Sequence, residues 1–115
     1  MGYYTEFTLE VDGLNSLSQV GREKLYSDLE RMGILEFYSD RYHNQDREVI
    51  DIPRTKWYEW EVEMLELSTN FPELKFTLWG NGEEFPDLWV SYFYRGELEF
   101  RRAEIVYPEP IIFSK

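Results

Sequence analysis

The stretch that decides the fold is residues 75–100, KFTLWGNGEEFPDLWVSYFYRGELEF. Apolar and polar residues alternate before and after residues 80–87, and again on both sides of Arg95-Gly96. This period-two pattern is typical of half-buried strands, and glycine, asparagine and acidic residues are typical of the turns between them. The stretch therefore predicts three consecutive antiparallel strands, with a turn begun by Gly80-Asn81-Gly82 and a last strand that continues to Tyr107.

A two-residue loop at Arg95-Gly96 also sets the register of the last two strands. It pairs Tyr94 with Glu97, Phe93 with Leu98, Tyr92 with Glu99, and Ser91 with Phe100. One face then carries Trp89, Phe93, Leu98 and Phe100, and the other carries Val90, Tyr92, Tyr94, Glu97, Glu99 and Arg101. The apolar residues after Phe100 continue out of phase, so we expect a β-bulge near Arg101 and Arg102.

The first half of the chain predicts a strand, a helix and two short strands. Residues 3–11 alternate as a half-buried strand, and Leu25, Leu29 and Met32 recur at helical spacing within residues 15–32. Asn15, Ser16 or Ser18 is suited to the N-cap of that helix, and Gly33 to its end. Short strands are expected at residues 34–38 and 48–52, with the polar stretch SDRYHNQDR between them.

A second helix is expected from a Thr55 cap to the residue before Pro72. Its apolar residues fall at spacings of three and four and form one stripe, Trp57, Trp60, Met64, Leu67 and Phe71. The carboxylates of Glu59, Glu63 and Glu66 share a different face.

These elements predict one α+β domain over residues 1–115, in which two helices pack on one face of a mainly antiparallel sheet. A ferredoxin-like or related split topology is the expected arrangement. The other face of the sheet is then open to solvent.

Composition limits the classes of partner. The chain has 23 Asp and Glu residues against 12 Lys and Arg, and its formal net charge is -11. Phosphate backbones and anionic membranes are repelled by such a charge, so neither nucleic acid nor a membrane is an expected ligand. There are no cysteines and no long apolar run, which favours a cytoplasmic protein, while 18% aromatic residues favour a folded one.

Few residue patterns indicate catalysis or a cofactor. Glu83, Glu84 and Asp87 lie in a hairpin turn, where acidic residues are usually solvated, although they also form a candidate contact site. Asp40, His43 and Asp46 have a spacing that a metal site can use, but one histidine with two loop acids is a weak signal. The sequence has no nucleophile elbow and no phosphate loop, so we expect no enzyme, no metal and no cofactor.

Aromatic side chains are the main feature of the predicted open sheet face. Tyr4, Trp79, Tyr92 and Tyr94 fall on this face, interleaved with glutamates. Tyrosine and tryptophan anchor protein interfaces because they combine a large apolar area with a polar tip. A foreign protein, a second copy of the chain, or simple cross-strand stabilisation of the sheet each accounts for this pattern.

Six short motifs stand in the chain: MGYYT at residues 1–5, a tryptophan-rich helix at 57–60, LSxxFP at 67–72, FTLxGxGEE at 76–84, DLW at 87–89 and YFxxG at 92–96. In these motifs the chain resembles a family of small phage and prophage proteins. Tyr94-Arg95 stands where the family usually has a more polar pair. The resemblance implies an accessory protein in a host cytoplasm, and it supplies no activity or site residues.

Two hypotheses follow. In the first, the protein is a non-enzymatic binder that inhibits a host defence protein, itself basic or nucleic-acid-binding, with the acidic residues Glu59, Glu63, Glu66, Glu83, Glu84 and Asp87 imitating the phosphates of a nucleic acid. In the second, it is a structural or assembly protein that forms a homodimer or larger oligomer through its open sheet face.

Overall fold

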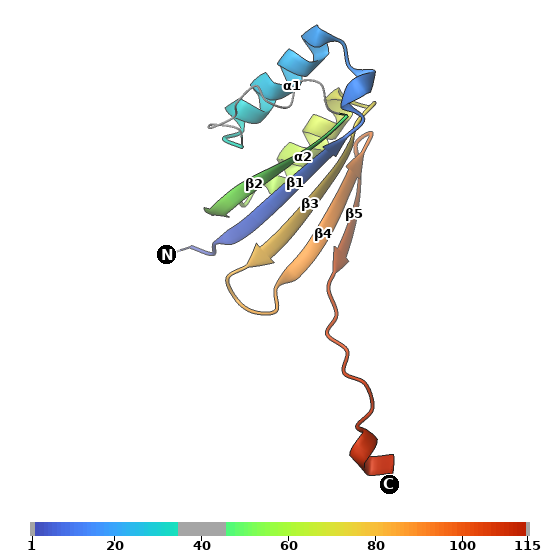
Figure 1. The fold of residues 1–115 in the computed structure, drawn as a ribbon. Helices are drawn as coiled ribbons and strands as arrows, with labels where there is room; N and C mark the ends of the chain where they lie inside the picture. Colours follow the sequence, from blue (N-terminus) through green and yellow to red (C-terminus); the bar gives the residue numbers. More distant parts are fainter. Residues whose placement is uncertain (1, 35–45, 115) are drawn as a thin grey trace.

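The computed structural model describes residues 2–34 and 46–114. In chain order, the elements are β1 (Thr5–Asp12), a 3-10 turn (Leu14–Ser16), α1 (Gln19–Arg31), β2 (Arg47–Thr55), α2 (Trp60–Asn70), β3 (Lys75–Gly82), β4 (Leu88–Tyr94), β5 (Glu97–Arg102) and a second 3-10 turn (Ile111–Ser114) (Figure 1).

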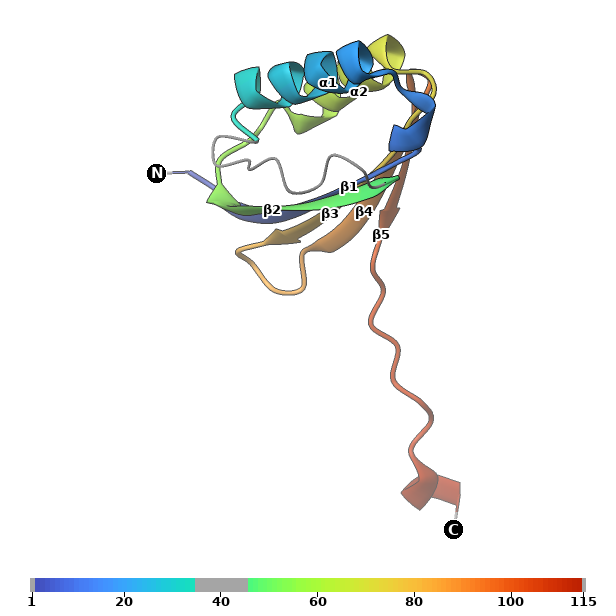
Figure 2. The ribbon, with the colours of Figure 1, turned by 45° about the horizontal axis from the view of Figure 1, so that its top comes forward.

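The five strands form one sheet in the order β2-β1-β3-β4-β5, and every neighbouring pair is antiparallel. Both helices cover the same face of this sheet (Figure 2), which confirms the predicted α+β class. Because β2 and β3 both run antiparallel to β1, they are parallel to each other, and α2 connects them with β1 in between. This is a split β-α-β unit. Of the two predicted arrangements, the sheet therefore has a related split topology and not the ferredoxin-like one.

The predicted hairpin between β4 and β5 is confirmed in register and in loop length. Tyr94 faces Glu97, and the following pairs match those expected. Arg95 and Gly96 have φ angles of 51° and 78°, both in the left-handed region that a type I′ turn requires.

The core lies between the helices and the inner face of the sheet. Alternate residues of the strands point into it, as the period-two pattern predicted. Buried strand residues include Phe7, Leu9, Val11, Phe76, Leu78, Trp89 and Phe93, and buried helix residues include Leu25, Leu29, Met64 and Leu67.

The start of α1 agrees with one of the three predicted caps. The side chain of Ser18 accepts a 3.1 Å hydrogen bond from the amide of Gly21, as an N-cap does. Gly33 has a φ of 81° just after the helix, which suits the predicted C-terminal stop.

The predicted start of α2 is wrong. Thr55 ends strand β2, where it pairs with Thr5, and the helix begins five residues later at Trp60. Strand β2 runs past Pro53 because it is an edge strand, and a proline on an edge needs no ladder donor. Trp57 therefore precedes the helix, but its ring still packs edge-on against Phe7, with ring centroids 5.1 Å apart.

The predicted extent of β5 is also wrong. The strand ends at Arg102, and residues 103–114 leave the sheet as a tail that is extended as far as its final 3-10 turn (Figures 1 and 2). The apolar residues after Phe100 are out of phase because the chain leaves the sheet there, so the predicted β-bulge is wrong. Residues outside the sheet have no inward face that a bulge would need to restore. The tail accounts for a radius of gyration of 17.2 Å, compared with roughly 13 Å for a compact chain of this length.

Two sequence predictions fall wholly or largely outside the described residues. These are the short strand at 34–38, apart from Ile34, and the Asp40 and His43 members of the weak metal pattern. Asp46 is described, and its side chain accepts a 2.9 Å hydrogen bond from the amide of Asn15.

Candidate functional site

The outer face of the sheet, opposite the helices, is built from cross-strand rows. Thr8 of β1 faces Trp79 of β3, which faces Val90 of β4, which faces Arg101 of β5. The next row contains Glu10, Thr77, Tyr92 and Glu99 in the same strand order. Trp79 and Tyr92 are therefore diagonal neighbours, within reach of one another's large side chains.

The four predicted aromatic residues are all exposed. The exposed fractions are 38% for Tyr4, 41% for Trp79, 44% for Tyr92 and 40% for Tyr94. Cations lie over two of these rings, with Lys56 Nζ 5.0 Å from the centroid of Tyr4 and Arg95 Cζ 4.9 Å from that of Tyr94. Trp79 and Tyr92 remain as the aromatic side chains at the middle of the face.

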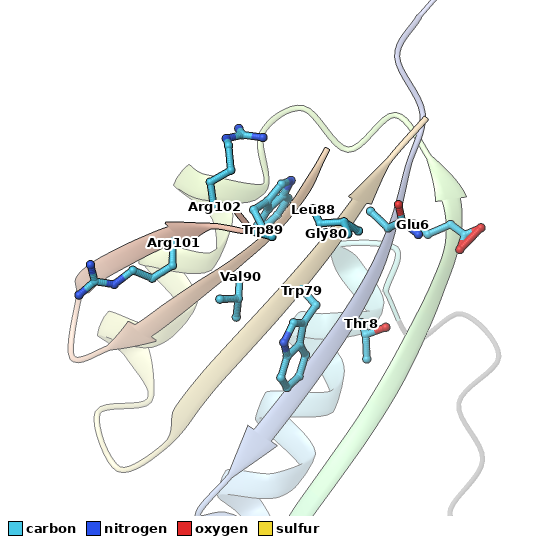
Figure 3. Close-up of a pocket in the computed structure, with 11 residues that line it drawn as sticks. Glu6, Thr8, Trp79, Gly80, Leu88, Trp89, Val90, Arg101 and Arg102 are labelled. Carbon is cyan, nitrogen blue, oxygen red and sulfur yellow. The ribbon is translucent and has the colours of Figure 1, made fainter. Parts of the chain in front are cut away.

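An outer groove of about 470 Å³ runs over the first of these rows (Figure 3). It arises because the short side chain of Val90 lies between the longer side chains of Trp79 and Arg101. Its lining comes from four strands and continues to the start of the tail: Glu6, Thr8, Trp79, Gly80, Asn81, Leu88, Trp89, Val90, Arg101, Arg102 and Ala103. We call this feature the outer groove. The sequence placed Trp79, Val90 and Arg101 on one face, but it did not predict the hollow between them.

The loop between β3 and β4 begins later than predicted. Strand β3 extends through Gly82, so the loop begins at Glu83 and the prediction that Gly80-Asn81-Gly82 forms the turn is wrong. Glycine is needed at two of these strand positions because other groups occupy the space that a side chain would fill. The ring of Trp89 takes this space at Gly80, and the Asp87 carboxylate with the Tyr3 hydroxyl takes it at Gly82.

Asp87 is the centre of a polar cluster at this end of the sheet. Its Oδ2 accepts a 2.6 Å hydrogen bond from the Tyr3 hydroxyl, and its Oδ1 forms a 2.7 Å ion pair with Arg102. The hydrogen bond from Tyr3, with help from Arg102, holds the pKa of Asp87 below its ordinary value, and the same hydrogen bond raises the pKa of Tyr3. Because these groups bind each other, the charge of Asp87 is largely neutralised within the chain.

Glu83 and Glu84 also contact the N-terminal residues. The side chain of Glu83 accepts a 2.7 Å hydrogen bond from the amide of Tyr4, and Arg54 lies 3.8 Å from its other oxygen. The amide of Glu84 donates a 3.2 Å hydrogen bond to the Tyr3 hydroxyl.

The helix acids lie in another part of the molecule. Glu63 and Glu66 line a cavity of about 170 Å³ between α2 and α1, together with Asp28 and Arg31. Glu59 is at the N-terminal end of α2, where no side-chain cap bond is formed. Glu63 and Glu66 therefore lie together on the helix layer, and Glu83 and Asp87 lie together at the end of the sheet.

A second aromatic site, which the sequence reasoning missed, lies on the inner side near Asp87. A cavity of about 230 Å³ is lined by Tyr3, Thr5, Phe7, Thr55, Trp57, Tyr58, Trp60, Asp87, Trp89, Phe100 and Arg102. Trp60 stacks on Trp89 at 4.4 Å, and the buried indole nitrogen of Trp57 has no hydrogen-bond partner in the described part of the chain. In the sequence, the predicted helical stripe contained Trp57 and Trp60, and the predicted inward strand face contained Trp89. These patterns indicated burial but did not indicate a cavity.

In residues 2–34 and 46–114, no three His, Cys, Asp or Glu side chains are grouped closely enough to hold a metal ion. No helix in the described part of the chain has the length and apolar character needed to cross a membrane. Comparisons of the chain with protein-family models, with curated proteins and with solved structures give no match.

Proposed function

We propose that this chain is a non-enzymatic protein-binding module that holds a polypeptide on the outer face of its sheet. The observation that carries this proposal is the outer groove beside the exposed ring of Trp79. Tryptophan and tyrosine are over-represented among residues that dominate binding energy, and Trp79 and Tyr92 stand at the centre of the face.

The shape of the groove favours a polypeptide. It crosses four neighbouring strands and opens on the sheet surface, so an extended segment can place successive side chains beside Trp79 and over Val90. Its lining is mixed, with apolar residues in the middle and Glu6, Arg101 and Arg102 at its ends. An apolar centre with a polar margin is the usual anatomy of a protein interface.

In the phage setting that the resemblance implies, the partner is a host protein, and binding inhibits it. The nucleic-acid-mimic version of this proposal uses the carboxylates as phosphate substitutes. The hydrogen bonds and ion pairs of Glu83 and Asp87 leave Glu59, Glu63, Glu66 and the exposed Glu84 as the main residues for that version. The location of Trp79 and Tyr92 supports an aromatic interface more directly.

The test is capture from a host lysate with matched variants of the immobilised protein, at low and at high salt. Trp79→Ser and Tyr92→Ser alter the outer face, and Val62→Ser alters an exposed apolar residue on the helix layer. A protein partner that binds the wild type and Val62→Ser, but is lost with Trp79→Ser, is the expected result. High salt should leave such binding largely intact because the contact is apolar.

Two other results have clear meanings. If a partner is released by salt and by the combined change Glu59→Lys, Glu63→Lys and Glu66→Lys, while Trp79→Ser has no effect, the mimic version replaces the aromatic one. Retention of every partner by all of these variants would contradict the use of either surface.

A further inference from the structure

The C-terminal tail, residues 103–114, is apolar and exposed along its length. Its six large apolar side chains are 48–84% exposed: Ile105, Val106, Tyr107, Ile111, Ile112 and Phe113. Glu104 and Glu109 are its only charged residues. Solvated tails are normally poor in aromatic and branched aliphatic residues, so a tail of this composition indicates a segment that becomes buried.

The tail begins at the outer groove but runs away from it. The amide of Ala103 donates a 2.9 Å hydrogen bond to the carbonyl of Leu88, and both residues line the groove. To cover the groove of its own chain, the tail would have to reverse within residues 104–107. That segment contains no glycine, and Pro108 and Pro110 hold the residues before them in extended backbone. The extended course in Figures 1 and 2 agrees with this local chemistry.

The tail is long enough to cross another copy of the sheet. The eight residues that precede the 3-10 turn, 103–110, span roughly 25 Å in an extended chain. Five strands spaced by about 4.8 Å are only roughly 20 Å across from the first to the last. A tail can therefore leave one molecule and still lie over the outer groove of a neighbour.

We propose that residues 104–113 of one copy occupy the outer groove of a second copy, and the reverse, so that two chains form a dimer by exchange of tails. This inference rests on the proposed binding function and names a second copy as the polypeptide. Each copy carries one tail and one groove, so a twofold arrangement covers both apolar surfaces at once and closes without further growth. Ile105, Val106 and Tyr107 supply side chains that match the apolar centre formed by Trp79 and Val90.

Charge gives the exchange a distinctive salt dependence. Two bodies with a formal net charge of -11 each repel one another, and the repulsion is weakened by salt. The contact itself is mainly apolar. Dimerisation by tail exchange should therefore become stronger as salt is raised, whereas binding by nucleic-acid mimicry should become weaker.

The experiment measures molecular mass by sedimentation, over a wide range of concentration and at two salt levels, for the full chain and two variants. One variant ends after Ala103, and the other is the full chain with Trp79→Glu. Both should keep the fold, because the side chains from 104 to 114 are all exposed and Trp79 lies on the outer face. We expect the full chain to dimerise, and each variant alone to be monomeric at concentrations where the full chain is dimeric.

Mixing the two variants gives the decisive result. The shortened chain retains an intact groove, and the Trp79→Glu chain retains an intact tail, so together they should form a one-to-one complex with a single tail contact. Val62→Glu, on the helix layer, is the matched control and should dimerise like the wild type. A monomeric full chain at every concentration, or variants that do not combine on mixing, would overturn tail exchange.

Other outcomes separate this inference from the proposed function. If the dimer survives removal of the tail but is lost with Trp79→Glu, tail exchange is wrong and the outer face still binds protein. The chain has no cysteine, so Phe113→Cys can carry a dye that reports burial of the tail. A dye shielded equally at all dilutions in a monomer would show that the tail folds back on its own chain, which also overturns the exchange. If Trp79→Glu changes neither the dimer nor the capture of any partner, both proposals fail.

Discussion

The indole rings of Trp60 and Trp89 stack with their centroids 4.4 Å apart and their planes 19° from parallel. This contact fastens the first turn of α2 to strand β4, and Phe93 and Phe100 extend it with ring centroids 6.3 Å from that of Trp60. We expect Trp60→Ala to lower the free energy of unfolding by about 3 kcal/mol, because it removes a large side chain from a packed aromatic cluster. Urea denaturation followed by circular dichroism measures this loss.

Val62 supplies the matched control for this prediction. It lies on the same helix but is 63% exposed, so Val62→Ala should change the free energy of unfolding by less than about 0.5 kcal/mol. Equal losses for the two substitutions would show that the stack does not hold the helix to the sheet.

A second prediction concerns the glycine opposite Trp89. Gly80 and Trp89 face each other in the ladder, and a Cβ atom at position 80 would overlap the indole ring. Gly80→Ala should therefore destabilise the protein by about 2 kcal/mol. In a Trp89→Leu background the same substitution should cost much less, because the ring is gone. A double-mutant cycle measures this coupling, and strictly additive effects would refute it.

Much of the fold could be predicted because strand alternation and turn chemistry are local properties. The β4–β5 register followed from Arg95-Gly96 alone, since a two-residue loop fixes every later pair. The start of α2 could not be predicted, because Thr55 remains in β2 through pairing with Thr5, fifty residues earlier in the chain. The end of β5 was wrong for a related reason: Ile105, Val106 and Tyr107 have strand-forming side chains, but no strand of the described part of the chain lies beside them.

The candidate site was predictable only in part. Alternation placed Trp79 and Tyr92 on the open face, but the outer groove requires the pairing of β1 with β3, which no local pattern reveals. The role of Asp87 depends on Tyr3, 84 residues away, so the acidic loop looked like a solvated contact surface in the sequence. Residues 103–107 have a composition that suits burial in a strand, although the burial that we propose lies in another molecule.

A third prediction compares two buried serines that should respond with opposite signs. Ser68 Oγ accepts a 3.0 Å hydrogen bond from the amide of Gly96 and donates one of 2.9 Å to the carbonyl of Leu65. Ser68→Ala leaves the turn amide without this partner and should cost about 1–3 kcal/mol.

Ser91 is equally buried, but its hydroxyl has no partner in the part of the chain that the structure describes. Ser91→Ala removes a polar group that burial disfavours, so it should be neutral or stabilise the protein by up to about 1 kcal/mol. Urea midpoints of the two variants, measured side by side, test the difference. A large loss of stability in Ser91→Ala would contradict it.

The last prediction is a dependence of stability on pH at both extremes, caused by the Tyr3–Asp87 hydrogen bond. The pKa of Asp87 is lowered in the folded chain, mainly by this bond and then by Arg102, so its contribution is present above the unfolded pKa of about 3.9 and is lost as pH falls through the lower folded pKa. The pKa of Tyr3 is raised, so its contribution is present below the unfolded pKa of about 10 and is lost as pH rises through the higher folded pKa.

Asp87→Asn should therefore flatten a plot of urea midpoint against pH at both its acid and its alkaline limb. Tyr3→Phe should abolish the share of the alkaline limb that comes from this bond and leave the Arg102 share of the acid limb. An Asp87→Asn curve parallel to the wild type from acid to alkali would show that this bond is not what links the protein's stability to pH.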